Sequence, residues 1–406
     1  MVRKLDNPET FTIIFLLVNT FLWFFMLISM IDQILEFLNA TDYETTLLTY
    51  AVFCASVVSF SLIGAFFSYR LRRLHIIYSW IIFGALASLF PIMLRQVTIK
   101  DVIVISFLLG GAFGFGMPSC LAVFVDMFPI EKRGYISGIV FLLTNLGAVP
   151  IIIFISSLTY RTNAILFSVW RIINILILFL SGTNKDYAML FTSKRQNPLY
   201  VIQNKSFIFY VIPWALFCLI SRLSDPIVDP IYREVLGEFP LLIKPIVGGI
   251  FAFIGGFLAD RIGRKKVIIY GFVSLGTAFA IVGIFPQVPF VWYLFVLINS
   301  VSAGIFWVIF ILTLWGDMSE EGSEFFYALG NLPFFVTWGV MQSISIKYLL
   351  LIPVYAIFSF ASFFLFLAVI PLMYAPETLP EKIIRQRELK RYIEKAKKIR
   401  EKYEKQ

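Results

Sequence analysis

The sequence predicts an all-α integral membrane protein, with twelve transmembrane helices arranged as two pseudo-symmetric six-helix bundles. The first observation is composition, because 59% of the 406 residues are hydrophobic and only 15% are charged. Soluble domains average about 45–50% apolar and about 25% charged residues. The second observation is that long apolar runs follow one another along most of the chain. The third is a set of short motifs that recur at half the length of the chain.

The apolar runs predict the individual spans. A helix needs about 20 apolar residues to cross the hydrocarbon core of a bilayer, which is ~30 Å thick. Twelve runs reach this length, and they predict spans at residues 11–35, 45–68, 75–94, 101–125, 135–158, 163–182, 207–229, 239–259, 267–286, 290–315, 325–346 and 352–374.

Residues with special chemistry are few. No small-residue cleavage site follows the N-terminal segment, so we expect no removable signal peptide. The three cysteines, Cys54, Cys120 and Cys218, lie in apolar runs, which is typical of buried thiols rather than of a disulfide framework. A single histidine, His75, excludes a histidine metal cluster and a Ser-His-Asp triad within this chain. We therefore expect no metal site and no cofactor.

The fourth span contains four glycines, at positions 110, 111, 114 and 116. A glycine-rich loop can bind phosphates when it follows a strand, but no soluble strand precedes this span. Small residues allow membrane helices to approach closely, so these glycines predict tight helix packing.

The distribution of Lys and Arg predicts the orientation. With both termini on the inner side, the inner segments and the C-terminal tail hold 26 of the 34 basic residues, and the outer segments hold 6. Basic short loops resist translocation. We therefore expect a multi-pass protein of the cell membrane whose N- and C-termini are cytoplasmic.

A short basic turn joins the eighth and ninth spans. Gly256 allows a neighbouring helix to come close, and Asp260 is placed to cap or face a helix terminus. Gly263 permits the tight reversal of the chain. Arg261 and Arg264 favour a cytoplasmic position for this turn.

A degenerate copy of the turn lies 192 residues earlier, where it keeps the glycine as Gly64 and a basic residue as Arg72. Asp126 and Asp317 are 191 residues apart, and each precedes a methionine. Pairs at nearly one offset indicate two homologous halves. We divide the chain into an N-terminal bundle at 1–182, a cytoplasmic linker at 183–206, a C-terminal bundle at 207–374 and a basic cytoplasmic tail at 375–406.

The tail from Glu381 holds eleven basic and five acidic residues. Apolar residues recur in it at mostly helical intervals, which favours a basic amphipathic helix at residues 381–406 that binds the anionic inner leaflet. A solvated charged helix is the alternative.

Three motifs together resemble the major facilitator superfamily of transporters. The turn at 256–266 is similar to the signature loop of that superfamily. The stretch Asp126–Gly134, with Gly138, looks like its acidic-x-Phe-Pro-x3-Arg-Gly-x3-Gly loop between helices four and five. Pro376-Glu377-Thr378 resembles the ending of its sugar-porter and organic-ion branches. The resemblance covers the whole chain, and it implies the major facilitator fold.

In that superfamily, charges in these loops form a network that holds the two halves together when the cavity faces outward. By resemblance, the gate and motif residues of this chain are Gly256, Asp260, Arg261, Gly263, Arg264, Asp126, Arg133, Gly134, Arg72 and Glu377. The alternative is that these residues are plain positive-inside charge with no part in gating.

Two features depart from the family pattern. The N-terminal copy of the signature turn lacks its acidic residue. The Gln-Leu-Ser-Gly pattern of sugar porters is absent from the seventh span, where Arg222-Leu-Ser-Asp225 stands instead. The resemblance therefore does not establish a sugar/proton symporter.

Transporters of this architecture bind their substrates near the midplane, between the halves. Arg171 lies eight residues inside the sixth span, about 12 Å deep at ~1.5 Å per residue. An arginine at that depth is a candidate for binding a carboxylate or phosphate, and a structural arginine satisfied by its neighbours is the alternative. The substrate-binding candidates are Arg171, Asn174, Asn19, Asn145, Asn299, Trp338 and Gln342.

The seventh span carries acids near its outer end. Asp225 and Asp229 each precede a proline, which disfavours helix at that position, so we expect the outer part of this helix to be broken. With Asp32, they are the candidates for proton coupling. The alternative for Asp225 is an outer-loop salt bridge with Arg222. Lys244 is interpreted as reaching outward to the membrane interface.

These features predict a secondary active transporter that works by alternating access. We expect it to move a small organic solute, either a sugar or, by preference, an anionic metabolite, with proton-coupled symport as the coupling candidate. Efflux of lipophilic compounds is an alternative, as is a receptor or scaffold with a transporter fold. No nucleophile-base or metal-ligand cluster points to an enzyme. The expected partners are the solute and the bilayer, without nucleic acid, and we expect a monomer.

Overall fold

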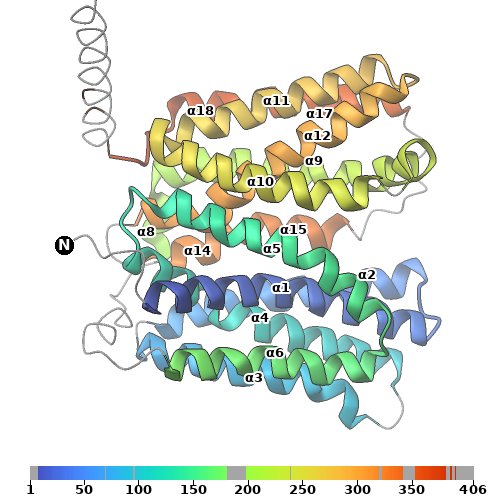
Figure 1. Ribbon diagram of the computed structural model, residues 1–406, viewed down its shortest axis with the longest axis vertical. Coiled ribbons are helices and arrows are strands. Elements are labelled where there is room, and N and C mark those ends of the chain that lie inside the picture. Colours follow the sequence, from blue (N-terminus) through green and yellow to red (C-terminus); the bar gives the residue numbers. More distant parts are fainter. Residues whose placement is uncertain are drawn as a thin grey trace, which may run out of the picture.

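The computed structural model describes residues 8–68, 70–94, 97–180, 198–237, 239–319, 322–341 and 353–380, together with residues 385 and 389. All regular elements in these ranges are helices, and they run roughly side by side as one bundle (Figure 1). The expected linker and tail lie largely outside the described residues, and Gln342 lies outside them entirely.

Six long helices make up the first half. They are α1 (Pro8–Phe37), α2 (Tyr43–Ser68), α3 (Arg73–Met93), α4 (Ile99–Met127), α5 (Arg133–Ser156) and α6 (Tyr160–Leu180). Polar side chains define two of their starts. Asp42 accepts a hydrogen bond from the backbone N–H of Thr45 at the start of α2, and this bond lowers the pKa of the Asp42 carboxyl. Thr98 and Asp101 form a capping box at the start of α4.

The second half begins after α8 (Pro198–Gln203). Its elements are α9 (Lys205–Leu236), α10 (Phe239–Ile262), α11 (Arg264–Ile284), α12 (Pro289–Phe306), the π-helix η1 (Trp307–Thr313), α13 (Leu314–Asp317), α14 (Glu324–Gly330), α15 (Leu332–Met341), α17 (Val354–Leu367) and α18 (Val369–Tyr374). In Figure 1 the two halves stack, with α5 and α10 side by side where they meet.

Eleven helices of the described residues are long and apolar enough to cross a membrane. The span predicted at 325–346 is described as far as Met341, where it consists of α14 and α15. The tenth predicted span is continuous from Pro289 to Asp317, because α12, η1 and α13 follow one another without a break.

The prediction of a broken seventh span is wrong. Helix α9 continues from Lys205 to Leu236 through Pro226 and Pro230. Each proline removes only its own backbone N–H, and neighbouring helices and small backbone adjustments compensate for such a loss in membrane helices. The bias of the preceding aspartates against helix is therefore overridden by tertiary packing.

The glycines of α4 pack as expected. A Cβ atom on Gly114 would lie 2.2 Å from the backbone oxygen of Val57, and one on Gly110 would lie 2.4 Å from that of Phe53. Both oxygens belong to α2, so α2 and α4 are in backbone contact and side chains have no room between them.

Candidate functional site

Charged residues from both halves gather at one end of the bundle, which we name the charged end. In the first cluster, the Arg73 guanidinium forms ion pairs with Asp126 and, at 2.5 Å, with Glu324. Arg73 and Glu324 are almost fully buried. Since Arg73 and Asp126 come from α3 and α4 and Glu324 comes from α14, this cluster joins the two halves.

The second cluster is centred on Asp317, at the end of α13. Its carboxylate accepts from Arg264 Nε at 3.0 Å and from Arg133 Nη1 at 2.8 Å. Arg264 also pairs with Asp260 at 2.8 Å. The side chains of Asp317 and Arg264 are 0% exposed, so this cluster is protected from solvent screening.

The two clusters are related by the internal repeat. Arg73 and Arg264, Asp126 and Asp317, and Arg133 and Glu324 are each 191 residues apart. In each cluster, an arginine and an aspartate from one half are joined by a residue from the other half. The network therefore carries the same pseudo-symmetry as the sequence.

Helices α5 and α10 cross at the charged end with their backbones in contact. A Cβ atom on Gly134 would lie 2.4 Å from the Gly256 oxygen, and one on Gly256 would lie 2.1 Å from the Gly134 oxygen. Asp260 accepts from the backbone N–H groups of Gly134 at 3.0 Å and Tyr135 at 2.7 Å. Asp260 thus faces a helix terminus as expected, and that terminus is the N-terminus of α5 in the other half.

Glu377 binds the N-terminus of α11. Its carboxylate accepts from the backbone N–H groups of Arg264 at 2.8 Å and Lys265 at 3.2 Å. Gly263 has φ +104°, and a side chain there would also collide with Glu377, which explains the glycine. Arg261 lies apart from the clusters, over the ring of Phe257 at 4.1 Å.

The structure places Arg73, rather than Arg72, in the network. Arg72 is the exposed N-cap residue of α3. Gly64 and Gly256 are 192 residues apart, and this offset pairs Arg264 with Arg72. The first turn, however, has one residue more than the second between its glycine and the arginine that forms the ion pairs, so the counterpart of Arg264 is Arg73. Glu324 was not foreseen. Its spacing of 191 from Arg133 is the signal that identifies it.

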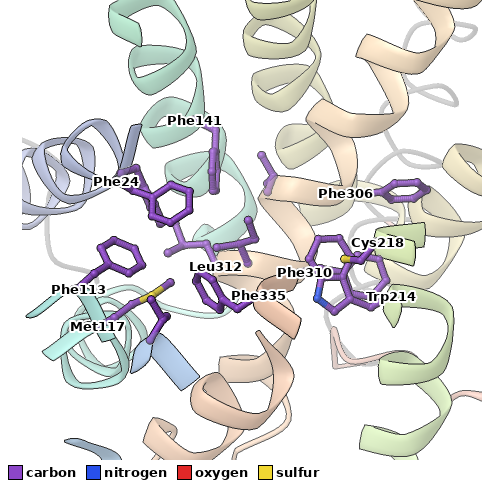
Figure 2. Packing of buried hydrophobic residues seen from close by; sticks show 14 of the residues in the cluster. Phe24, Phe113, Met117, Phe141, Trp214, Cys218, Phe306, Phe310, Leu312 and Phe335 are labelled. Atoms are coloured by element: carbon purple, nitrogen blue, oxygen red, sulfur yellow. The ribbon is translucent and has the colours of Figure 1, made fainter. Parts of the chain in front are cut away.

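An apolar pocket, which we name the aromatic pocket, lies between the halves. Figure 2 shows Phe24, Phe113, Met117, Phe141 and Phe335 gathered around it, with a second aromatic cluster beside it. The lining residues are Phe21, Phe24, Phe25, Phe113, Met117, Phe141, Thr144, Trp307, Ile311, Asn331, Phe334 and Phe335.

Two lining residues of the aromatic pocket carry a hydroxyl or an amide, namely Thr144 and Asn331. The Thr144 hydroxyl donates to the backbone oxygen of Val140 at 2.8 Å, within its own helix. The Asn331 amide nitrogen is 3.5 Å from the backbone oxygen of Ile311, and its Oδ1 has no hydrogen-bond partner among the described residues. Asn331 Oδ1 is therefore a buried acceptor without a described partner.

The substrate-binding candidates do not form one site. Arg171, Asn174 and Asn19 meet inside the first half, where the Asn174 amide donates to Asn19 Oδ1 at 2.5 Å, and none of the three lines the aromatic pocket. The others lie apart from this group: Asn145 packs against Gly249 of α10, Asn299 lies beside Tyr232, and Trp338 contacts the rings of Phe24, Tyr50 and Phe53.

Each acid proposed for proton coupling has a partner. Asp32 accepts a hydrogen bond from the Tyr50 hydroxyl. Asp225 pairs with Arg222 at 3.2 Å, and Asp229 lies 3.9 Å from Lys244. Lys244 also lies over the Tyr232 ring at 4.4 Å, so it packs within the bundle beside an acid.

No group of His, Cys, Asp and Glu that could hold a metal ion occurs within the ranges that the structure describes. The charges instead pair with one another at the charged end and at the ends of α9 and α10.

Comparisons with known proteins agree with this architecture. The human organic anion transporter MFSD10 (TETRAN) superposes with a TM-score of 0.63 at 14% identity, over 89% of this chain and 98% of that one. The proton:xylose symporter XylE, bound to 6-bromo-6-deoxy-D-glucose, gives a TM-score of 0.69 at 13% identity, over 91% and 96%. XylE from E. coli in a partially occluded inward-open conformation gives a TM-score of 0.63 at 13% identity, over 91% and 98%.

A search of curated protein sequences gave no match. The family model described as Major Facilitator Superfamily matches residues 12–238, which is more than half of the chain. The chain belongs to the major facilitator superfamily.

Proposed function

We propose that this transporter moves a small organic solute with a mainly apolar body, which binds in the aromatic pocket. Members of the superfamily are multi-pass membrane transporters of small solutes and not enzymes. The observation that carries the substrate class is the lining of the pocket, where rings from α1, α4, α5, η1 and α15 face one space between the halves.

The polarity of the lining favours an apolar solute over a sugar. Each sugar hydroxyl that leaves water needs a new hydrogen bond, or it costs free energy. The lining has two side-chain oxygens: Asn331 Oδ1, which is buried, and the Thr144 hydroxyl, which already donates within its own helix. An apolar body instead gains by burial, at roughly 25 cal/mol per Å². The lining therefore supports a lipophilic solute over a sugar of the kind bound to XylE.

The ion clusters support an alternating-access cycle for this transporter. They join the halves at the charged end, and opening that end requires breaking both clusters. We place the charged end and both termini in the cytoplasm, at the cell membrane, because the basic residues concentrate there. Labelling of Glu131→Cys by a membrane-impermeant maleimide in intact cells should fail, and efficient labelling would contradict this orientation.

Proton coupling is assigned to Asp225, with Asp229 and Asp32 as further candidates. The Arg222 guanidinium that pairs with Asp225 lies 5.8 Å from the ring centre of Phe334, which lines the pocket. Protonation of Asp225 would release Arg222, and a freed Arg222 can move against Phe334. This connection gives the proton a route by which to influence the solute site.

Thermal stability of the purified protein tests the substrate class. Neutral aromatic solutes should raise the unfolding temperature, since a ligand that binds only the folded state stabilises it according to its concentration over its Kd, and sugars should not. Phe335→Ala should weaken this binding about tenfold or more, because a buried ring contributes roughly 1.5–3 kcal/mol.

Phe363→Ala is the matched control, since Phe363 is 60% exposed on the outside of α17. Stabilisation by sugars alone, or equal effects of the two substitutions, would contradict the proposal.

A further inference from the structure

Arg171 is a buried charge inside the first half. It lies on α6 and is 0% exposed. One nitrogen, Nη1, lies within hydrogen-bond distance of Thr20 Oγ1 at 3.2 Å and Asn19 Oδ1 at 3.5 Å. The guanidinium packs against two indole rings, at 4.3 Å from Trp23 and 4.4 Å from Trp80. Two indole rings therefore pack against the cation, and one of its three nitrogens is satisfied.

The other edge of the guanidinium is formed by Nε and Nη2, and Nε lies close to α3, where a Cβ atom on Gly84 would be 3.0 Å away. Arg171 Nε and Nη2 have no hydrogen-bond partner among the described residues, and no described carboxylate pairs with Arg171. These two nitrogens share one edge of the planar group, so their N–H bonds point the same way. Asn174 Oδ1 is also unpartnered among those residues. An uncompensated charge at this depth is costly, and in membrane proteins it marks a ligand or ion site by default.

We propose that the first half holds a second binding site, separate from the aromatic pocket, in which the free edge of Arg171 binds a carboxylate. Two parallel N–H donors match the two oxygens of a carboxylate, and this bidentate geometry is the reason that arginine is favoured for such ligands. The two indole rings that pack against the guanidinium hold the fork in place and exclude water, which strengthens the charged hydrogen bonds.

Trp23 is the boundary between this site and the aromatic pocket. Its ring is 6.1 Å from that of Phe113, which lines the pocket, and Arg171 lies against Trp23. The Trp23 indole N–H donates to Ser88 Oγ over 3.3 Å. The carboxylate can therefore come from two sources: the head group of a solute whose apolar body lies in the pocket, or a separate small ion.

Sodium formate tests the site without involving the pocket. Formate should raise the unfolding temperature of the wild-type protein above the effect of sodium chloride at equal ionic strength, and above that of formamide, which has the same shape without the charge. Arg171→Gln should abolish the difference, and Arg171→Lys, which keeps the charge but loses the fork, should weaken formate binding about tenfold or more.

Arg161→Gln is the matched control, since Arg161 is exposed on the same helix. If Arg171→Gln does not fold, the results for Arg171→Lys and for formamide still test whether Arg171 binds a carboxylate. The proposal would be overturned if formate raised the unfolding temperature of the wild-type protein no more than chloride does, or if Arg171→Lys kept the full effect of formate.

Comparing the binding of 3-phenylpropanoate with that of its amide and of formate identifies the source of the carboxylate. A head group is indicated if the acid binds at least tenfold more tightly than formate, and if Phe335→Ala weakens the acid but not formate. A separate ion is indicated if the acid binds no better than its amide while formate still depends on Arg171. Either result supports the site, because both require Arg171. If neither formate nor 3-phenylpropanoate depends on Arg171 for binding, the proposed site is overturned, while the proposal for the aromatic pocket still stands.

Discussion

At the scale of single residues, Arg73 determines whether the first ion cluster exists. Its guanidinium pairs with Asp126 and Glu324, which without it would be two neighbouring like charges. Removing one partner from a buried ion pair costs roughly 3–5 kcal/mol. Arg73→Gln should therefore shift the population towards open forms of the charged end. Spin labels at Glu131→Cys and Lys266→Cys, one in each half, should report a longer distance.

Arg72→Gln is the control for this experiment, because Arg72 is the exposed neighbour of Arg73. It should leave the distance distribution unchanged. If Arg73→Gln also left it unchanged, the ion clusters would not hold the charged end closed.

The sequence repeat can be aligned in two ways, and the alignment determines whether Arg72 or Arg73 is predicted to lie in the network. Both turns have a glycine and basic residues, and alignment on the glycines selects Arg72. Alignment on Asp126 and Asp317 selects Arg73 and also finds Glu324 opposite Arg133. A difference of one residue in turn length changes the partner completely, because the next side chain along a helix points about 100° away.

At the scale of elements, the crossing of α5 and α10 depends on the absence of side chains at two positions. A Cβ atom on Gly134 would lie 2.4 Å from the Gly256 oxygen and 2.7 Å from Asp260 Oδ1. Gly134→Ala should therefore separate the two helices and weaken the hydrogen bonds to Asp260. We expect a loss of about 1–3 kcal/mol in unfolding free energy, measured by denaturation in detergent, together with a longer distance between the spin labels.

Gly147→Ala provides the comparison on the same helix. A Cβ atom there would lie 3.4 Å from its nearest neighbour, Leu22 Cδ1, which is an ordinary contact. The substitution should be neutral or slightly stabilising, since alanine is the better helix former. Equal costs at both positions would mean that general helix effects, and not this crossing, explain the glycines.

The elements themselves were largely predictable, since their existence follows from the length of the apolar runs. Their interruptions were not. Asp225-Pro226 predicted a break in α9 that does not occur, whereas the π-helical segment from Trp307 to Thr313 lies in a run with no glycine or proline. Local propensity is a weak guide where packing against neighbouring helices determines the backbone.

At the scale of the whole molecule, the aromatic pocket could not be found from the sequence. The chain has 45 phenylalanines, and membrane helices are apolar on every side, so periodicity does not distinguish a pocket from a lipid face. Phe335 is 5% exposed in the pocket and Phe363 is 60% exposed on the outside. Arg171 was recognisable by its depth, but its separation from the pocket by Trp23 depends on how α1, α4 and α6 pack.

Uptake into proteoliposomes under an inward proton gradient tests the central claim most directly. A labelled neutral aromatic solute, chosen from the stability panel, should accumulate above equilibrium in wild type and in Phe363→Ala. In Phe335→Ala its apparent affinity should fall about tenfold or more. Asp225→Asn should still equilibrate the solute but should not accumulate it. Accumulation of a sugar without uptake of any apolar solute, or identical uptake by Phe335→Ala and wild type, would contradict transport through the aromatic pocket.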